Sequence, residues 1–361
     1  MGWVDYDTLP SQRPFHSRCP SGPAPTRRYL LKSLQTASEY PSACMKGEIR
    51  YLPLLLSQVW FGKRSTQLPM NPVFSYREAF SRNIGWVTAA EQEMLRTKRI
   101  AIAGMGGVGG SHLMTLVRLG VGAFHVADFD TFDTANFNRQ VGAAVSTLGK
   151  PKVQVLSAMA KDVNPELDIR VFPDGVNDAN LAEFLAGVDL YVDGLDFFAF
   201  AARQATFAAC SRLKIPAITA APIGMGAALL NFLPGKMSFE DYFLWGNKSD
   251  DEKAVRFLLG LAPRGLHRRY LVDPTSVSLA EQRGPSTIIG CNLCAGVAAA
   301  EGVKILLKRG KVFAAPHGIH FDGYRNKLVR TWLPGGNNHP LQRLAISIGR
   351  RQMEKIKLRA A

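Results

Sequence analysis

The sequence predicts an α/β fold of the Rossmann-like type, with a mostly parallel sheet, helices on both faces and a C-terminal antiparallel extension. Three observations lead to this prediction. Short apolar runs alternate with helix-forming segments between residues 99 and 235, a glycine-rich turn follows the first run, and the last apolar runs flank a turn. Alternating strands and helices favour a parallel sheet, because each helix returns the chain to the same edge.

The first predicted element lies before the glycine-rich turn. The segment TAAEQEMLRT (88–97) begins with a capping Thr and has Glu91 three residues later, which predicts a helix. Later units continue the alternation. Strands are predicted at 99–104, 123–130, 169–173 and 189–196, and helices at 111–120, 151–163, 179–187 and 198–213.

The second half of the domain begins with an uncharged stretch. Residues 215–235 are long enough to cross a bilayer, but their prolines and glycines would break any helix, so they predict two buried strands and no membrane span. Residues 236–285 are more polar and predict an insertion that crosses the sheet, either a receptor for a substrate tail or a packing lid. A long apolar helix is predicted at 286–309 and a hairpin at 318–336.

Composition and charge set limits on the class of protein. The 361 residues are 47% hydrophobic, which excludes wholesale disorder, and the net charge of +15 favours anionic partners. Five scattered cysteines argue against a secreted disulfide scaffold, and no secretory signal is visible, so we expect a cytoplasmic protein. Three parts are expected: a basic, Ser/Pro-rich extension (1–69), an organised domain (70–335) and a basic C-terminal tail (336–361). The extension is interpreted as disordered, or as translated from upstream of a true start at Met70.

The glycine-rich segment GMGGVGGS (104–111) predicts a nucleotide site. Gly104, Gly106 and Gly109 have the spacing at which backbone can approach a pyrophosphate. A helix beginning at Ser111 would direct free N–H groups toward that anion. Asp128, 24 residues after Gly104, ends the next predicted strand, where a carboxylate can bind ribose hydroxyls. This pattern predicts an adenosine nucleotide and does not separate NAD from ATP.

Residues farther along favour ATP. Arg139 and Lys152 could neutralise phosphate charge, and Asp196 ends a later parallel strand, where a carboxylate could hold Mg²⁺. A hydride-transfer enzyme has no need for cations placed beyond the ribose. The plainer interpretation makes Arg139 and Lys152 surface cations and Asp196 a helix cap.

Together these motifs resemble the ThiF/MoeB/HesA family of adenylyltransferases, which are similar to ubiquitin-activating enzymes. The motifs are GMGGVGGS (104–111), DFD (128–130), NFNRQ (136–140), GKPKV (149–153) and VDGLD (192–196). The resemblance implies that residues 70–335 form an ATP-binding adenylyltransferase domain. It implies an ATP-binding loop of Gly104, Gly106, Gly107 and Gly109, a ribose acid Asp128 with Asp130 behind it, and phosphate contacts from Asn136, Arg139 and Lys152. It also implies a magnesium-linked catalytic Asp196, and an Arg82 that reaches the partner's site in a homodimer.

The implied reaction is attack of a carboxylate on the α-phosphorus of ATP, which yields an acyl-adenylate and pyrophosphate. The expected substrate is the C-terminus of a small ubiquitin-like carrier, or a peptide. A tRNA-modifying adenylation and cyclisation enzyme is an alternative, although the basic residues gather in the tails without interleaved aromatics. A non-catalytic ATP-binding scaffold is another alternative, and an NAD-dependent oxidoreductase is disfavoured.

The cysteines depart from the family pattern. Many members bind zinc through two CxxC pairs, whereas this chain has one, Cys291 to Cys294, so zinc is not expected. The pair is interpreted as core residues or as a reactive thiol. A helix N-terminus lowers the pKa of a thiol, which makes Cys291 a possible nucleophile. The crossing insertion contains no cysteine, which argues against thioester transfer. Cys210 and His112 are interpreted as packing residues.

Overall fold

This computed structural model describes residues 73–277 and 284–360, and of residues 355–360 only the backbone. The chain divides between Asn71 and Pro72, and all that follows concerns the second part. The predicted extension (1–69) and the alternative start at Met70 lie outside the described residues.

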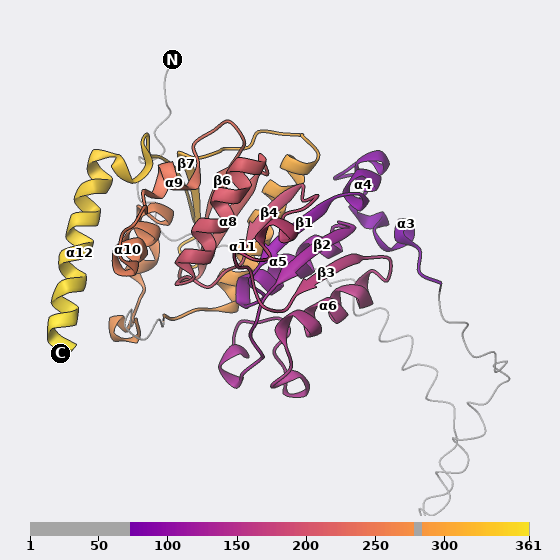
Figure 1. The fold of residues 1–361 in the computed structure, drawn as a ribbon, viewed down its shortest axis with the longest axis horizontal. Helices are drawn as coiled ribbons and strands as arrows, with labels where there is room; N and C mark the ends of the chain where they lie inside the picture. The colour runs from indigo at the N-terminus through magenta and orange to yellow at the C-terminus, as the bar shows by residue number, and fades with distance from the viewer. Residues whose placement is uncertain (1–72, 278–283, 361) are drawn as a thin grey trace, which may run out of the picture. The chain divides into compact units, whose positions relative to one another are not determined.

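The centre of this part is one eight-stranded sheet with the order β3-β2-β1-β4-β5-β6-β7-β8 (Figure 1). The strands are β1 (Arg99–Ala103), β2 (Ala123–Ala127), β3 (Asp168–Phe172), β4 (Leu190–Asp193), β5 (Ala217–Pro222), β6 (Gly226–Phe232), β7 (His317–Asp322) and β8 (Lys327–Trp332). The pairs from β3 to β5 are parallel, and β5 to β8 pair antiparallel. The predicted fold class, including its antiparallel C-terminal part, is confirmed.

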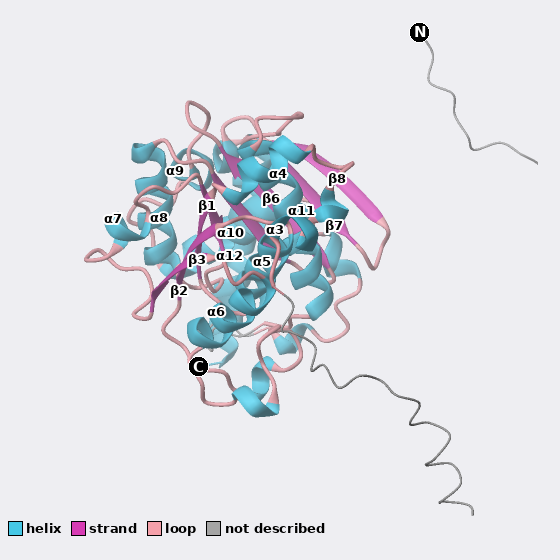
Figure 2. Cartoon of the chain, turned by 90° about the vertical axis from the view of Figure 1, so that its right-hand side faces the viewer, coloured by secondary structure: helices cyan, strands magenta, loops and turns pink. Residues whose placement is uncertain are grey.

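Helices cover both faces of this sheet (Figure 2). They are α3 (Tyr76–Ala79), α4 (Ala89–Arg96), α5 (Gly107–Arg118), α6 (Lys152–Val163), α7 (Leu181–Phe184), α8 (Phe200–Leu213), α9 (Phe239–Phe243), α10 (Asp250–Leu261), α11 (Ile288–Leu306) and α12 (Pro340–Ala360). Helices α5, α6 and α11 share one hydrophobic core with the sheet, and α7 to α10 share the other. This two-sided burial explains why the central strands are almost continuously apolar.

The predicted insertion (236–285) contributes to the second core. Its helices α9 and α10 and the segment between them bring Phe239, Phe243, Trp245 and Phe257 into one cluster of tilted and edge-on rings. Each of these four side chains is at most 3% exposed. The segment therefore packs like the rest of the domain. Its aromatic side chains are large and apolar, so their burial stabilises the packed arrangement.

The uncharged stretch 215–235 forms β5 and β6, as predicted. In the described ranges, α11 is the one helix long and apolar enough to cross a bilayer. It packs against α5, β5 and β6, which is the arrangement of a core helix. The C-terminal segment is also packed: α12 lies along α10 and closes a small core with Val255, Ile346 and Met353 (Figure 1).

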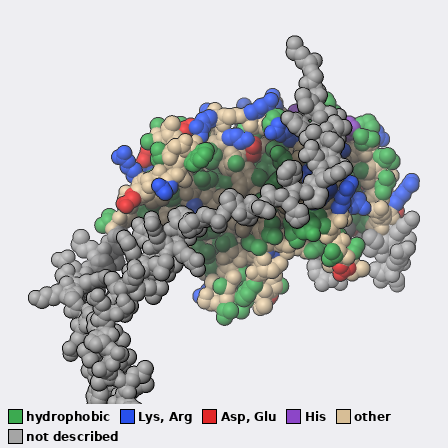
Figure 3. All heavy atoms as spheres, turned by 180° about the vertical axis from the view of Figure 1, so that it is seen from behind, with side chains coloured by type: hydrophobic (Ala, Val, Ile, Leu, Met, Phe, Trp, Pro, Cys, Tyr) green, Lys and Arg blue, Asp and Glu red, His purple; other side chains and the backbone are tan. Residues whose placement is uncertain are grey.

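Charge is not confined to the ends of the chain. Figure 3 shows Lys and Arg side chains along the rim of one face of the molecule, around a middle in which apolar side chains gather. The large apolar side chains exposed on the described surface include those of Trp86 (85%), Ile288 (38%) and Ile289 (47%).

Candidate active site

Three parallel strands end at one edge of the sheet. Strands β2, β1 and β4 are neighbours in parallel register, so Asp128, Gly104 and Gly194 follow their carboxyl ends side by side. In open α/β sheets, ligands bind outside the carboxyl ends of the strands. The motifs that the sequence singled out therefore meet at this edge.

The glycine-rich turn closes by backbone contact. A Cβ placed on Gly109 would lie 1.7 Å from the carbonyl oxygen of Gly104, and one on Gly104 would lie 2.2 Å from the carbonyl oxygen of Gly194. Gly104 also has a φ of +85°, which side chains rarely adopt. These glycines are needed for packing between the turn after β1 and the turn after β4.

The helix after this turn starts earlier than predicted. Helix α5 begins at Gly107 with Gly106 as its N-cap residue, so the predicted start at Ser111 is wrong by a full turn. Consecutive glycines concealed the start, because their low helix propensity resembles that of a loop. The free N–H groups of the first turn consequently belong to the glycine-rich segment itself, next to the carboxyl edge.

Gly107 is the point where three candidate residues meet. A Cβ at this position would lie 2.9 Å from the Sγ of Cys291 and 3.3 Å from the Cγ of Arg139. Arg139 donates hydrogen bonds from Nη1 to the carbonyl oxygen of Ala135 and to Oδ1 of Asn138, both at 2.9 Å. It forms no ion pair within residues 73–277 and 284–360, so its charge is available to an anion at the turn.

Asp128 is tied to the turn that it was predicted to accompany. One carboxylate oxygen accepts a hydrogen bond from the backbone N–H of Met105 at 2.5 Å, and the other accepts from the N–H of Asp130 at 2.8 Å. Burial raises the pKa of this carboxyl, while the two N–H donors oppose that shift. Each oxygen keeps a second lone pair for a ribose hydroxyl.

Lys152 and Asp130 form an ion pair of unequal exposure. The Nζ of Lys152 lies 2.8 Å from Oδ2 of Asp130, and the side chains are 6% and 51% exposed. The N–H of Lys152 also donates to the carbonyl oxygen of Asp130. Lys152 starts α6 and its amine is held at the edge by a carboxylate, so its predicted phosphate contact stays a prediction.

Asn136 caps a short 3₁₀ turn by accepting from the N–H of Asp133.

Asp196 lies in a loop, because β4 ends at Asp193, three residues before the end of the predicted strand. Asp196 is exposed, and its Oδ1 accepts from the N–H of Phe198 at 3.0 Å, which is a local cap. No hydrogen bond to its Oδ2 occurs in the described part of the chain. One carboxylate oxygen is therefore open to a ligand.

A buried ion pair that the sequence analysis missed shapes this loop. Asp193 accepts from the Nε of Arg203 at 2.8 Å and from the hydroxyl of Thr219 at 2.9 Å, and the side chains of the ion pair are each 2% exposed. The guanidinium also donates to the carbonyl oxygens of Leu195, Asp196 and Phe197. The apolar run Phe200–Ala202 directly before Arg203 was the available signal, since an arginine is seldom buried without a partner.

Gln140 is a second residue that the analysis passed over, although it ends the quoted NFNRQ motif. Its side chain is 7% exposed, and its Oε1 has no hydrogen-bond partner among the described residues. Its Nε2 lies 3.8 Å from where a Cβ on Gly106 would stand. A buried amide without a partner beside the turn is a group that a bound ligand could satisfy.

Arg82 is not brought to this edge. It belongs to a 3₁₀ turn (Ser81–Asn83) whose Asn83 donates to the carbonyl oxygen of Leu119, just beyond the C-terminal end of α5. The glycine turn lies at the other end of that helix, about 18 Å away at 1.5 Å per residue. Within one chain, Arg82 therefore stands apart from the other candidate residues.

The thiol of Cys291 is less reactive than its position suggested. Cys291 lies in the first turns of α11, but its residue is 1% exposed and burial raises the pKa of the thiol. The expected lowering of this pKa is wrong, because desolvation outweighs the favourable charge of Arg139. Cys210 and Cys294 are buried, and so is His112, whose pKa is lowered by burial to about 3. No cluster of three or more metal-ligating residues occurs in the described ranges.

Comparison with known proteins identifies the family to which the chain belongs. The model of the ThiF family matches residues 80–343. The Bacillus subtilis tRNA threonylcarbamoyladenosine dehydratase is 33% identical over 150 residues, which cover 41% of this chain and 57% of that protein. The Escherichia coli molybdopterin-synthase adenylyltransferase is 33% identical over 141 residues, which cover 39% and 56%. The Escherichia coli sulfur carrier protein ThiS adenylyltransferase is 28% identical over 165 residues, which cover 46% and 65%.

Solved structures show the same fold. Escherichia coli MccB with MccA has a TM-score of 0.55 at 20% identity and covers 70% of each chain. PaaA has a TM-score of 0.54 at 17% identity and covers 86% of this chain and 90% of that one. At these identities the two structures establish the fold alone. The chain spans roughly half to two thirds of the length of the curated relatives that it matches.

Proposed function

Because the chain belongs to the ThiF family, we propose that it is an ATP-dependent adenylyltransferase that activates a carboxylate as an acyl-adenylate and releases pyrophosphate. The proposed substrate is the C-terminus of a small carrier protein or of a peptide. Relatives named as adenylyltransferases of molybdopterin synthase and of the sulfur carrier ThiS support this choice. The proposed compartment is the cytoplasm.

One observation carries the proposal. The backbone contacts among Gly104, Gly109 and Gly194 join the phosphate-binding turn to the loop that holds Asp196. Arg139 lies beside Gly107 of the same turn. A helix N-terminus, a cation that forms no ion pair with any described residue and an exposed carboxylate therefore adjoin one turn, which is the set of groups that the phosphates of ATP would need. A dehydrogenase has no need for this grouping.

The proposed mechanism depends on positioning and charge. The first-turn N–H groups of α5 and the guanidinium of Arg139 would hold the phosphates, and Asp128 would orient the ribose. A carboxylate oxygen of the substrate forms a bond to the α-phosphorus while the bond from that phosphorus to pyrophosphate breaks. No proton is transferred, because the attacking carboxylate is already ionised at neutral pH. Orientation of the two reactants is then the main contribution of the protein.

A magnesium ion fits this edge. Oxygen ligands are what Mg²⁺ prefers, and Asp196 presents a carboxylate oxygen with no other bond in the described residues. Asp196 would hold the ion, which when bound neutralises phosphate charge. The exposure of Asp196 leaves room for the several water ligands that Mg²⁺ retains.

ATP–pyrophosphate exchange tests the proposal. The purified protein with Mg²⁺ is incubated with a panel of carrier proteins, peptides and tRNA, and labelled pyrophosphate incorporated into ATP is measured. We expect exchange with one class of substrate, and a loss of about 100-fold or more in Asp196→Ala and Arg139→Ala. Gln154→Ala is the matched control, because Gln154 is an exposed residue of α6.

The other outcomes are informative. Tight ATP binding without exchange for any panel member would contradict the proposal and favour a non-catalytic ATP-binding scaffold. Binding of NADH in place of ATP would contradict the nucleotide assignment. Exchange with tRNA alone would favour the second candidate function, tRNA modification, for which the 33% identity to a tRNA threonylcarbamoyladenosine dehydratase is the supporting observation.

A homodimer is part of the proposal. Arg82 is exposed and lies far from the glycine turn of its own chain, so it is available to a neighbouring subunit. Exposed Trp86 is close to it in sequence, and Ile288 and Ile289 of α11 expose further apolar surface. Burial of such side chains between two subunits would stabilise a symmetric pair.

A further inference from the structure

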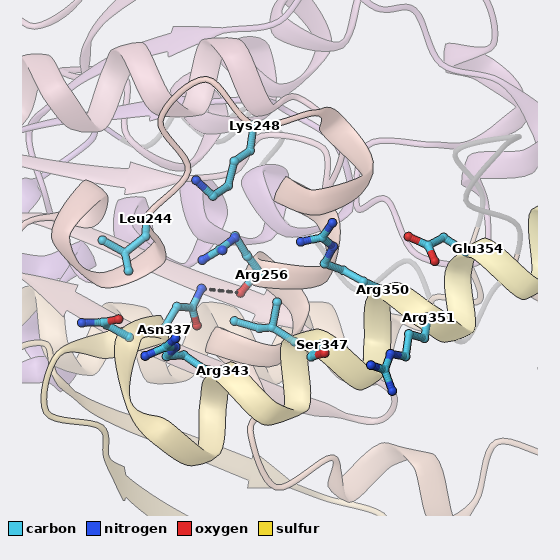
Figure 4. A pocket seen from close by; sticks show the side chains of 11 residues that line it. Leu244, Lys248, Arg256, Asn337, Arg343, Ser347, Arg350, Arg351 and Glu354 are labelled. Atoms are coloured by element: carbon cyan, nitrogen blue, oxygen red, sulfur yellow. Dashed lines mark hydrogen bonds between the residues drawn. The ribbon is translucent and has the colours of Figure 1, made fainter.

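A second site lies between α10 and α12. A cavity of about 660 Å³ opens there, and no residue that lines it belongs to the candidate active site. Figure 4 shows its walls. Lys248, Arg256, Arg343, Arg350 and Arg351 line it with a single carboxylate, Glu354. We name it the α10–α12 groove.

Most of this positive charge is not neutralised locally. Glu252 pairs with Arg256 at 2.9 Å and approaches Arg350 at 3.6 Å. Lys248, Arg343 and Arg351 form no ion pair with any residue that the structure describes. With Glu252 and Glu354 counted against the five cations, the groove keeps three positive charges. Cations held close together repel one another, so an anionic ligand in the groove is favoured.

The groove is a built feature and not a gap beside a loose tail. The buried amide of Asn337 donates to the carbonyl oxygens of Phe243 at 2.9 Å and Arg256 at 3.1 Å. Val255 of α10 packs against Ile346 and Met353 of α12. These contacts hold the two helices in place, so the backbone of the walls does not have to become ordered on binding.

An apolar stripe adjoins the groove on α12. Leu341, Leu344 and Ile348 are 71%, 60% and 48% exposed, and their spacing places them on one side of the helix. Arg351 follows Leu344 by seven residues, so it stands beside this stripe. This face of α12 therefore presents the guanidinium of Arg351 next to the side chain of Leu344.

We propose that the α10–α12 groove and the adjoining apolar stripe bind an acidic amphipathic segment of a partner polypeptide. Carboxylates of that segment would pair with Arg343 and Arg351, since a guanidinium binds a carboxylate through two parallel hydrogen bonds. Apolar side chains of the same segment would cover Leu341 and Leu344. The proposal does not depend on the chemistry of the nucleotide site.

Other occupants fit less well. Nucleic acid would use the cations but gain nothing from the leucines, and no aromatic ring lines the groove to stack on a base. A second copy of this chain carries a net charge of +15. Residues 1–69 hold nine Lys and Arg against four Asp and Glu, so the extension of this chain is not complementary either.

The groove is one helix away from the candidate active site. Phe257 follows Arg256 of the groove wall on α10, and its ring centroid lies 4.7 Å from the guanidinium carbon of Arg203. Arg203 in turn holds the backbone of the loop that carries Asp196. A helix with its side chains is about 10 Å across, so a segment bound in the groove would be anchored near that loop without covering it.

Direct binding tests this proposal. A fluorescein-labelled peptide of Glu-Glu-Leu repeats is titrated with the full-length protein at low salt, and anisotropy is measured. A peptide of Gln-Gln-Leu repeats serves as the uncharged comparison. Arg343→Glu with Arg351→Glu is expected to weaken binding of the acidic peptide by about tenfold or more. Leu341→Ser with Leu344→Ser is expected to weaken it without a change in charge.

A matched control separates the groove from net charge. Arg118→Glu with Arg212→Glu makes the same change in charge at two exposed positions elsewhere and is expected to leave affinity within about twofold. Thermal unfolding checks that every variant is folded. Equal binding of the acidic peptide by the Arg343/Arg351 variant and the control would overturn the proposal. Loss of tRNA or duplex DNA binding, without loss of peptide binding, would instead assign the groove to nucleic acid.

Discussion

A methyl group added at Gly109 would collide with the backbone of the glycine-rich turn. Replacing Gly109 by Ala would place the new carbon 1.7 Å from the carbonyl oxygen of Gly104. In an ordinary helix the same change stabilises by about 1 kcal/mol. Here we expect the opposite sign, a loss of about 1–3 kcal/mol in the free energy of unfolding, measured by urea denaturation, together with weaker ATP binding.

Gly106 provides the matched control for that prediction. A Cβ at Gly106 meets nothing closer than the Nε2 of Gln140 at 3.8 Å. Gly106→Ala should therefore cost no more than about 1 kcal/mol in the free energy of unfolding, because its cost is only that Ala is a poorer N-cap residue than Gly. Equal stability of Gly109→Ala and Gly106→Ala would contradict the close packing of the turn.

His112 makes stability depend on pH. Burial lowers its pKa from 6.5 to about 3, and neither ring nitrogen has a partner in the described part of the chain. Below pH 6.5 the unfolded state takes up a proton that the folded state refuses, so the stabilisation present above pH 6.5 is lost as the pH falls toward 3. This loss of unfolding free energy amounts to at most about 1.4 kcal/mol per pH unit, and it should be absent from His112→Leu.

Urea denaturation at pH 7.5 and 5.5 measures the effect of this histidine. The difference in unfolding free energy between His112→Leu and the wild type should shift in favour of the variant at the lower pH. Gln154 is exposed and has no ionisable side chain, so Gln154→Ala is a suitable comparison and should show no such shift. A constant difference between His112→Leu and the wild type would contradict the assignment.

At the scale of elements, the loop after β4 depends on α8. Arg203 pairs with Asp193 and donates to three successive carbonyl groups of the loop. Arg203→Met leaves the buried carboxylate without its cation, so we expect a loss of about 3–5 kcal/mol in unfolding free energy. Pyrophosphate exchange should fall as well, since the loop would no longer position Asp196.

Lys98 and Asp189 form a more exposed pair with a similar distance of 2.9 Å, and their side chains are 25% and 33% exposed. Lys98→Met should cost less than about 1 kcal/mol, because solvent screens such a pair. Exchange by Arg203→Met at the wild-type rate per folded molecule would contradict the role of Arg203 in positioning.

At the scale of the whole molecule, the proposed dimer predicts complementation. Arg82→Ala and Asp196→Ala should each lose exchange activity as pure proteins. A mixed dimer contains one site with both lesions and one site with neither, if Arg82 serves the partner's site. Mixing the two variants by refolding should then restore about a quarter of the wild-type rate.

The control for this experiment is a mixture of wild type with the double variant that carries both Arg82→Ala and Asp196→Ala. Sedimentation verifies that dimers form. No recovery from the mixed single variants would mean that Arg82 acts within its own chain, whereas full exchange by Arg82→Ala alone would mean that it has no part in the reaction. Its position beyond the C-terminal end of α5 would then require another explanation.

The sequence predicted the fold and the nucleotide edge because the signals are local. The apolar runs at β1 and β4 and the Thr88–Glu91 capping box each depend on residues a few positions apart. The spacing of Gly104, Gly106 and Gly109 likewise describes one turn of backbone. Such patterns follow from the strand and helix periods and from turn chemistry, so they can be interpreted without knowledge of the rest of the chain.

Tertiary structure alone decided how those local pieces constrain one another. The sequence contains Gly194 and Arg203, but only packing shows that one touches Gly104 and the other holds the loop of Asp196. Cys291 had the helix position of an activated thiol, yet burial raised its pKa. Burial and long-range contacts depend on elements that are far apart in the chain, and desolvation can reverse what a local pattern predicts. The sequence therefore determined which groups stand at this edge, and the packing of β1, β4 and α8 determined which of them are free to act.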